Sequence, residues 1–127
     1  IIRNINFKNP FTILRLGLGL VFLANAWVAW FSPQEFQELI TGSVILNHLP
    51  AISVSVMTII IGINDSLLAL IFLFNFKPAM KNALAWAMIW LIAVMLVILE
   101  PVDILEHLGF FSIALALFVN LKQSSQP

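Results

Sequence analysis

Two charged residues, Asp65 and Arg15, lie inside long apolar stretches of this sequence and could carry chemistry there. A carboxylate or guanidinium in lipid is costly, so such groups face a protein interior and mark proton relays, ligand sites or polar contacts between helices. Asn64 and Ser66 flank Asp65 and add hydrogen-bonding capacity at the same depth. These four residues are therefore the predicted intramembrane polar site.

Asp65 shares a helical face with small and polar residues. Thr58, Gly62 and Ala69 lie at helical spacing from it, so we expect this face to point into a helix bundle. One interpretation is a site that exchanges protons or binds a ligand. The other is a buried polar anchor that joins one helix to another.

Two interpretations of Arg15 stand side by side. It could pair with Asp65 by reaching inward, because antiparallel neighbouring helices would bring their corresponding halves together, or it could extend toward lipid phosphates. Gly19, Phe22 and Ala26 share its helical face, which favours close helix packing there.

His48, Glu106 and His107 form a second set of candidates near the ends of apolar segments. Two histidines on different helices could ligate haem, and with nearby carboxylates they could bind a metal. No spacing motif supports either group, so we expect no metal site. The simpler interpretation is a solvated interface, with a quinone headgroup contact as the alternative.

The high apolar content of the sequence indicates a membrane protein. Of the 127 residues, 61% are apolar and 9% are charged, and there is no cysteine. Soluble domains carry roughly 25% charged residues, and one this small could not cover so much apolar surface. The absence of cysteine excludes thiolate chemistry, and the formal net charge of +0 gives no indication of a nucleic-acid partner.

Hydrophobic length predicts an all-α membrane protein, a bundle of four transmembrane helices in one domain. About 20 apolar residues are needed for each span. The segments lack the alternating pattern of barrel strands. The expected spans are about 10–31, 51–76, 79–99 and 104–121.

Charge placement predicts the orientation. All lysines and arginines fall on one side of this topology, which the positive-inside rule assigns to the cytoplasm together with both termini. The basic residues are Arg3, Lys8, Arg15, Lys77, Lys81 and Lys122. The acidic residues on the other side are Glu35, Glu38, Glu100, Asp103 and Glu106.

A short helix in the outer interface is predicted between the first two spans. Ser32 is the expected N-cap, Glu35 would complete a capping box, and Gly42 would end the helix. Trp27 and Trp30 would form an aromatic belt at this interface.

Small residues and tryptophans recur along the third span. Ala79, Ala83 and Ala87 are four residues apart and favour close helix packing. Trp86 and Trp90 occupy a different stripe, which we expect to face lipid or a partner subunit.

Two segments resemble the DoxX-like family of small four-helix membrane proteins. The first span, LRLGLGLVFLANA, resembles the family's opening helix, in which an arginine precedes a glycine-containing apolar run. The second, IGINDSLLALIFLF, places Asp65 where the family usually has glutamate, and FKPAMK matches its basic loop. The resemblance implies association with membrane redox complexes, since some relatives are subunits of a thiosulfate:quinone oxidoreductase.

Three functions are consistent with these observations. The first is an accessory subunit of a quinone-linked redox complex in a bacterial or archaeal inner membrane, with the bilayer and other membrane subunits as partners. The second is an autonomous quinone-linked oxidoreductase with Asp65 as proton acceptor. The third is a small proton-coupled transporter. Quinone or lipid is the expected ligand class, and the scarcity of chemical groups suits a subunit better than a self-contained enzyme.

Overall fold

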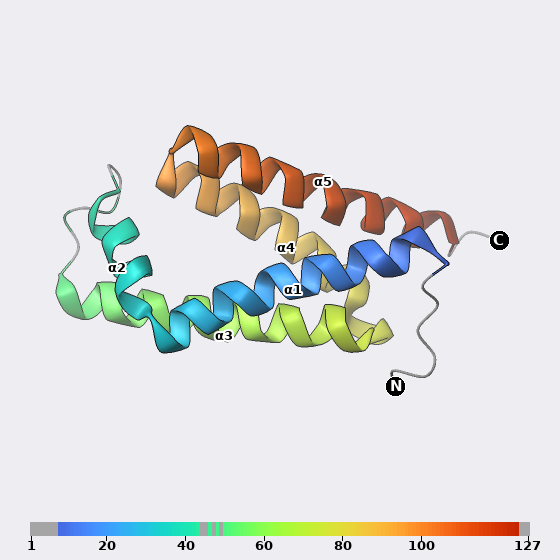
Figure 1. The fold of residues 1–127 in the computed structure, drawn as a ribbon, viewed down its shortest axis with the longest axis horizontal. Coiled ribbons are helices and arrows are strands. Elements are labelled where there is room, and N and C mark those ends of the chain that lie inside the picture. The colour runs from blue at the N-terminus through green and yellow to red at the C-terminus, as the bar shows by residue number, and fades with distance from the viewer. Residues whose placement is uncertain (1–7, 44–45, 47, 49, 125–127) are drawn as a thin grey trace.

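The protein is a bundle of four long helices and one short one (Figure 1). The structure, a computed structural model, describes residues 8–43, 46, 48 and 50–124; Arg3 of the predicted charge pattern lies outside them. Helices are the only regular secondary structure in the described ranges, which confirms the predicted fold class. The helices are α1 (Pro10–Phe31), α2 (Pro33–Thr41), α3 (Ala51–Phe74), α4 (Lys77–Ile98) and α5 (Pro101–Ser124).

The four long helices are each long and apolar enough to cross a membrane, so the chain is an integral membrane protein. Their ends differ slightly from the expected spans. Helix α3 stops at Phe74 because Asn75 adopts a left-handed conformation with φ 52. Helix α5 begins at Pro101. Proline suits the first position of a helix because the backbone N–H group that it lacks would have no hydrogen-bond partner there.

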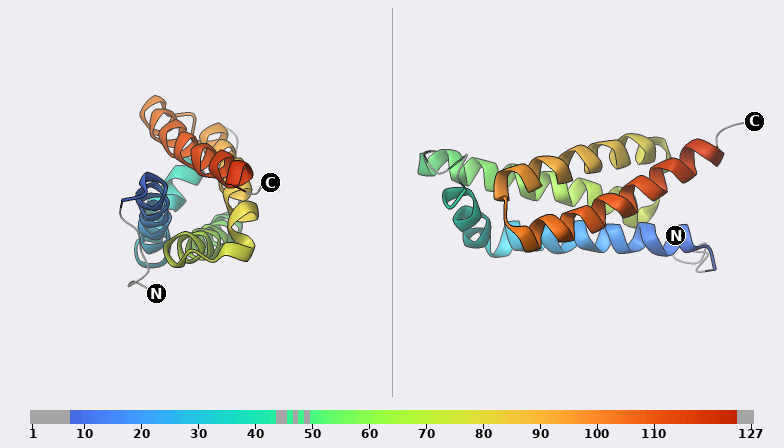
Figure 2. Two further views of the ribbon diagram at one scale, coloured as in Figure 1. Left: turned by 90° about the vertical axis from the view of Figure 1, so that its right-hand side faces the viewer. Right: turned by 90° about the horizontal axis from the view of Figure 1, so that it is seen from above.

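The long helices pack mainly as two pairs, α1 with α3 and α4 with α5 (Figures 1 and 2). The start of α1 and the end of α5 lie at one end of the bundle, while α2 and the α4–α5 turn lie at the other. We call the first the basic end, because Lys8, Lys77, Lys81 and Lys122 lie there. The second is the acidic end, which carries Glu35, Glu38, Glu100, Asp103 and Glu106.

Two glycines set the close approach of α1 and α3. A Cβ atom at Gly19 would lie 2.8 Å from Cγ of Leu73, and one at Gly62 would lie 2.9 Å from the ring of Trp30. These two antiparallel contacts place the end of α1 level with about residue 61 of α3. The first ten or so residues of α3 therefore extend past α1 by about 15 Å.

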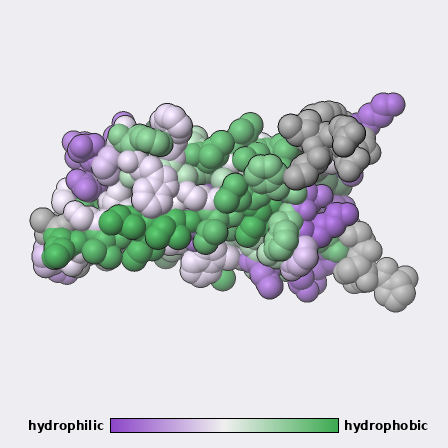
Figure 3. All heavy atoms as spheres, turned by 90° about the horizontal axis from the view of Figure 1, so that it is seen from below, coloured by the Kyte–Doolittle hydropathy of each residue, from purple (hydrophilic) through white to green (hydrophobic). Residues whose placement is uncertain are grey.

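The buried core lies between the helix pairs. Leu18 and Phe22 of α1, Phe72 of α3 and Leu84 of α4 are its most buried large side chains. Outward-facing surfaces are apolar between the two ends, where polar side chains gather (Figure 3). This pattern is the one that a bilayer requires, since its core offers no water to polar groups.

Helix α2 lies at the acidic end, between α1 and α3, as predicted for the short connecting helix. Gly42 is its C-cap, and Ser32 is its N-cap, but the predicted capping box is wrong because no side-chain bond caps α2. The N–H group of Ser32 bonds instead to the carbonyl of Val28 at the end of α1. Ser32 is the single residue between α1 and α2, and this bond to α1 holds its backbone at φ −138 and ψ 56.

Candidate functional site

Asp65 lies near the middle of α3 and is 2% exposed. Thr58 and Ala69 on the same face are equally enclosed, at 2% and 1%, and Gly62 is buried. The prediction that this face points into the bundle is therefore confirmed. The hydroxyl group of Thr58 bonds to the carbonyl of Val54 in its own helix, so it does not contact the carboxylate.

The neighbouring Asn64 connects Asp65 to helix α4. Its Nδ2 donates to Asp65 Oδ1 at 3.0 Å, and its Oδ1 accepts a bond from Trp86 Nε1 at 2.5 Å. The indole of Trp90, one turn along α4, is a further side-chain donor near the carboxylate. Trp86 is 46% exposed, in keeping with a stripe that faces lipid or a partner subunit, but its N–H group turns toward α3, a contact that spacing did not predict.

Ser66 makes the corresponding contact on the other side of α3. Its Oγ accepts a hydrogen bond from Trp30 Nε1 of α1 at 3.0 Å. Two polar residues of α3, one on each side of Asp65, thus accept hydrogen bonds from indole N–H groups of two different helices. Tryptophan suits these contacts because its large apolar ring packs well against apolar surroundings, while its N–H group requires a hydrogen-bond acceptor when it is buried.

Arg15 does not pair with Asp65, so that prediction is wrong. Its Nη1 donates to the carbonyl oxygens of Phe72 and, at 3.4 Å, Leu73. These carbonyls belong to the last turn of α3, whose acceptors have no partner within the helix and carry the negative end of its dipole. The guanidinium therefore stabilises the C-terminus of α3.

The stagger of α1 against α3 explains why the two charges stay apart. The contacts at Gly19 and Gly62 place Asp65 opposite Trp27, which is twelve residues, or about 18 Å along the axis, from Arg15. An arginine side chain does not span that distance.

The surroundings of Asp65 favour an anchor over a reactive site. Two cavities lie near the basic end, and neither is lined by Asp65, Asn64 or Ser66. Among the described side chains, no buried nitrogen or oxygen atom lacks a hydrogen-bond partner. An enclosed carboxylate that is hydrogen-bonded to Asn64, itself bonded to Trp86 of α4, suits a role in joining α3 to α4.

The second set of candidates is spread over the acidic end. His48 is exposed in the α2–α3 connection, and Glu106 is exposed on α5. His107 is half-buried, and its Nδ1 lies 2.6 Å from the carbonyl oxygen of Asp103. Because that oxygen can only accept, the proton of a neutral ring resides on Nδ1. The described chain brings together no group of three or more His, Asp or Glu residues that could hold a metal.

Sequence reasoning missed a polar cavity at the basic end. It is lined by groups from the first turns of α1 and α4, the α3–α4 turn and the last turns of α5, including Arg15, Lys77 and Asn120. The residues are far apart in sequence, and only the pairing of helices brings them together. The charge pattern indicated which end would be basic, but not that a cavity would form there.

Comparison with known proteins found no relative of this chain. It matches no family model, no curated protein and no solved structure.

Proposed function

We propose that this protein is an accessory subunit of a quinone-linked membrane redox assembly. It would act by packing against other transmembrane subunits rather than by catalysing a reaction itself. The observation that carries this proposal is the amide group of Asn25 in α1.

Asn25 is half-buried and lies six residues before the end of α1, about 9 Å along the helix. It makes no hydrogen bond with any residue that the structure describes, whereas Asn64 and Arg15 both have partners. An unbonded amide inside a bilayer costs several kcal/mol, roughly, because lipid offers neither donor nor acceptor. A polar group on a neighbouring transmembrane helix would satisfy it.

The enclosure of Asp65 supports the same choice among the three functions. A proton acceptor for a quinone, or a carboxylate in a transporter, must be reached by its substrate or by water. Asp65 is 2% exposed and lines neither of the two cavities near the basic end. Its neighbours suit a role in holding α3 against α4.

The redox character of the assembly rests on the DoxX-like resemblance of the first two spans. That resemblance places Asp65 and the basic FKPAMK loop at positions typical of the family. The orientation, with both termini in the cytoplasm of a bacterial or archaeal cell, rests on the positive-inside rule.

The test is affinity purification of the tagged protein from its native membrane in mild detergent, followed by mass spectrometry and an optical spectrum. We expect redox subunits with a visible chromophore to co-purify. Asn25→Leu should lose them and Asn25→Gln should retain them, because glutamine keeps the amide. Asn82→Leu is the matched control, since Asn82 is exposed near the basic end of α4. A homogeneous preparation without partner or chromophore would contradict the proposal, as would normal co-purification with Asn25→Leu.

A further inference from the structure

The cavity at the basic end has a volume of about 350 Å³, and about half of its lining residues carry hydrogen-bond donors. Arg15 and Lys77 supply positive charge, and Asn9, Asn75 and Asn120 supply amide groups. None of its lining residues is acidic. The chemistry of the lining therefore selects an anion.

Several of these donors are available to a ligand. Arg15 uses Nη1 for the carbonyls of α3, while its Nε and Nη2 bond to no described residue. Lys77 is exposed and forms no ion pair within the described chain. A guanidinium with free N–H groups beside an ammonium group is a typical arrangement for binding phosphate oxygens.

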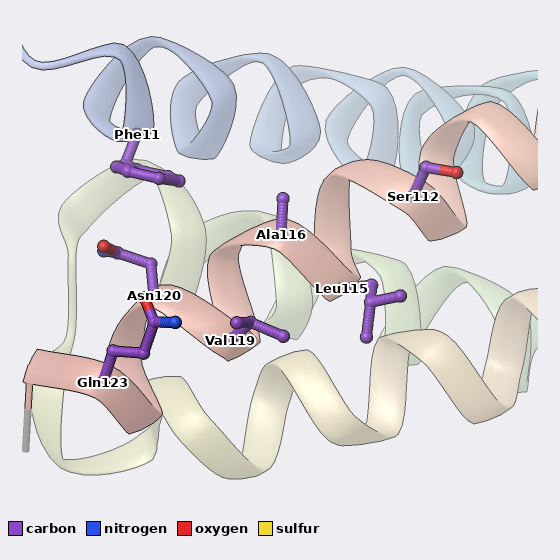
Figure 4. Close-up of a pocket in the computed structure, with 7 residues that line it drawn as sticks. All are labelled: Phe11, Ser112, Leu115, Ala116, Val119, Asn120 and Gln123. Atoms are coloured by element: carbon purple, nitrogen blue, oxygen red, sulfur yellow. The ribbon is translucent and has the colours of Figure 1, made fainter.

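An apolar groove lies next to this cavity and shares two lining residues with it, Phe11 and Asn120. Its volume is about 380 Å³. Figure 4 shows Phe11 pointing from α1 toward α5, along which the remaining lining residues are arrayed. They are Ser112, Leu115, Ala116, Val119 and Gln123.

The length of the groove matches one leaflet of a bilayer. Ser112 and Gln123 are eleven residues apart on α5, which corresponds to about 16 Å. Half of the hydrocarbon core is about 15 Å thick. The groove therefore runs from the basic end to about the middle of the membrane. The Ser112 hydroxyl bonds to the carbonyl of Leu108, so the inner end of the groove presents little free polarity.

We propose that the cavity and groove together bind one anionic phospholipid of the leaflet at the basic end. The phosphate lies between Arg15 and Lys77, and one acyl chain lies along α5 between Phe11 and Ser112. Because lipid tails are as apolar as the groove, the groove positions the chain while the headgroup supplies the preference. Basic pockets between helices near a membrane surface recognise anionic headgroups in this way.

The test is native mass spectrometry of the delipidated full-length protein, titrated with dioleoylphosphatidylglycerol or dioleoylphosphatidylcholine. Arg15 is left intact because it also holds the end of α3. Lys77→Gln removes one charge from the cavity, and Lys81→Gln is its control, since Lys81 does not line the cavity. Ala116→Phe fills the groove, and Ala93→Phe on the exposed face of α4 is its control. Inorganic phosphate is added separately as a competitor.

We expect phosphatidylglycerol to bind more tightly than phosphatidylcholine, and Lys77→Gln to raise its Kd about fivefold, the equivalent of about 1 kcal/mol per surface charge. Ala116→Phe should weaken phosphatidylglycerol binding, whereas both control variants should bind like the unmodified protein. An equal loss with Lys81→Gln would overturn the proposal, because it would indicate diffuse attraction to a basic surface. The proposal would also be overturned if inorganic phosphate displaced phosphatidylglycerol completely and Ala116→Phe had no effect on binding. That result would show that the cavity is a site for the free phosphate ion.

Discussion

Replacing Gly62 with alanine tests the contact that sets the spacing of α1 and α3. The added Cβ would lie 2.9 Å, 3.0 Å and 3.3 Å from three atoms of the Trp30 ring. Carbon atoms pack comfortably at about 3.5–4.0 Å, so the ring would have to move by about 0.6 Å or more. It cannot turn aside freely, because its Nε1 is bonded to Ser66 at 3.0 Å.

The expected cost combines two effects. Overfilling a packed interface costs about 1–3 kcal/mol. Losing the Trp30–Ser66 hydrogen bond adds about 0.6 kcal/mol, the average for such bonds between membrane helices. We therefore expect Gly62→Ala to lower the free energy of unfolding by about 1.6–3.6 kcal/mol relative to a Gly→Ala change without steric overlap.

Gly17→Ala is the matched control, because a Cβ there meets nothing within 4 Å. It adds the same methyl group to the same pair of helices and also raises helix propensity, by at most about 1 kcal/mol. The assay is reversible unfolding in mixed micelles of dodecylmaltoside and SDS, followed by far-ultraviolet circular dichroism.

A second variant distinguishes steric overlap with the Trp30 ring from any other effect of the alanine substitution at Gly62. Trp30→Ala removes the ring, so the added cost of Gly62→Ala should largely disappear in that background. The reasoning is refuted if Gly62→Ala unfolds at the same SDS fraction as Gly17→Ala. It is also refuted if the cost of Gly62→Ala persists in full without the Trp30 ring.

Three further predictions concern the polar contacts and the orientation. Arg15→Gln should increase amide hydrogen exchange in the last turn of α3, around Phe72, because its carbonyls lose a charged donor; unchanged exchange there would contradict this role. Trp86→Phe and Asn64→Leu should each lower the free energy of unfolding. The loss in the double variant should be smaller than the sum of the two single losses by about 0.6–1.7 kcal/mol. Strictly additive losses would show that the two side chains do not interact. A reporter enzyme fused after Lys122 should be active only on the cytoplasmic side, and periplasmic or extracellular activity would reverse the assignment of sides.

Hydrophobic length and helical spacing were sufficient to predict several features of the fold. The four long helices lie close to the expected spans, and the short helix before Gly42 is present. The inward direction of Asp65 followed from the small residues Gly62 and Ala69 on its face. These features depend on local sequence, which is why they could be predicted from it.

The partner of Arg15 could not be predicted in this way. Hydropathy gives the length of each span but not the axial offset between two spans. Here the Gly19–Leu73 and Gly62–Trp30 contacts set an offset that brings Arg15 to the end of α3. A backbone carbonyl is present at every residue, so no sequence pattern marks it as the acceptor.

The tryptophans were misjudged for a different reason. An indole suits both the membrane interface and a buried hydrogen bond, so spacing alone does not distinguish the two. Trp86 is 46% exposed, as expected for a lipid-facing residue, while its N–H group donates a hydrogen bond to Asn64. Each residue thus serves two environments, and the sequence indicated only one of them.

The contact between Arg15 and α3 also has a consequence for how the protein is made. The acceptor carbonyls belong to residues 57 and 58 positions farther along the chain. At a synthesis rate of roughly 5–20 residues per second, Arg15 is added to the chain about 3–12 s before those carbonyls exist. Until the end of α3 has been made, the first helix must be held by the translation and insertion machinery or remain at the membrane surface with its guanidinium in water. We therefore expect α1 and α3 to settle into the bilayer together, as a pair, rather than one after the other.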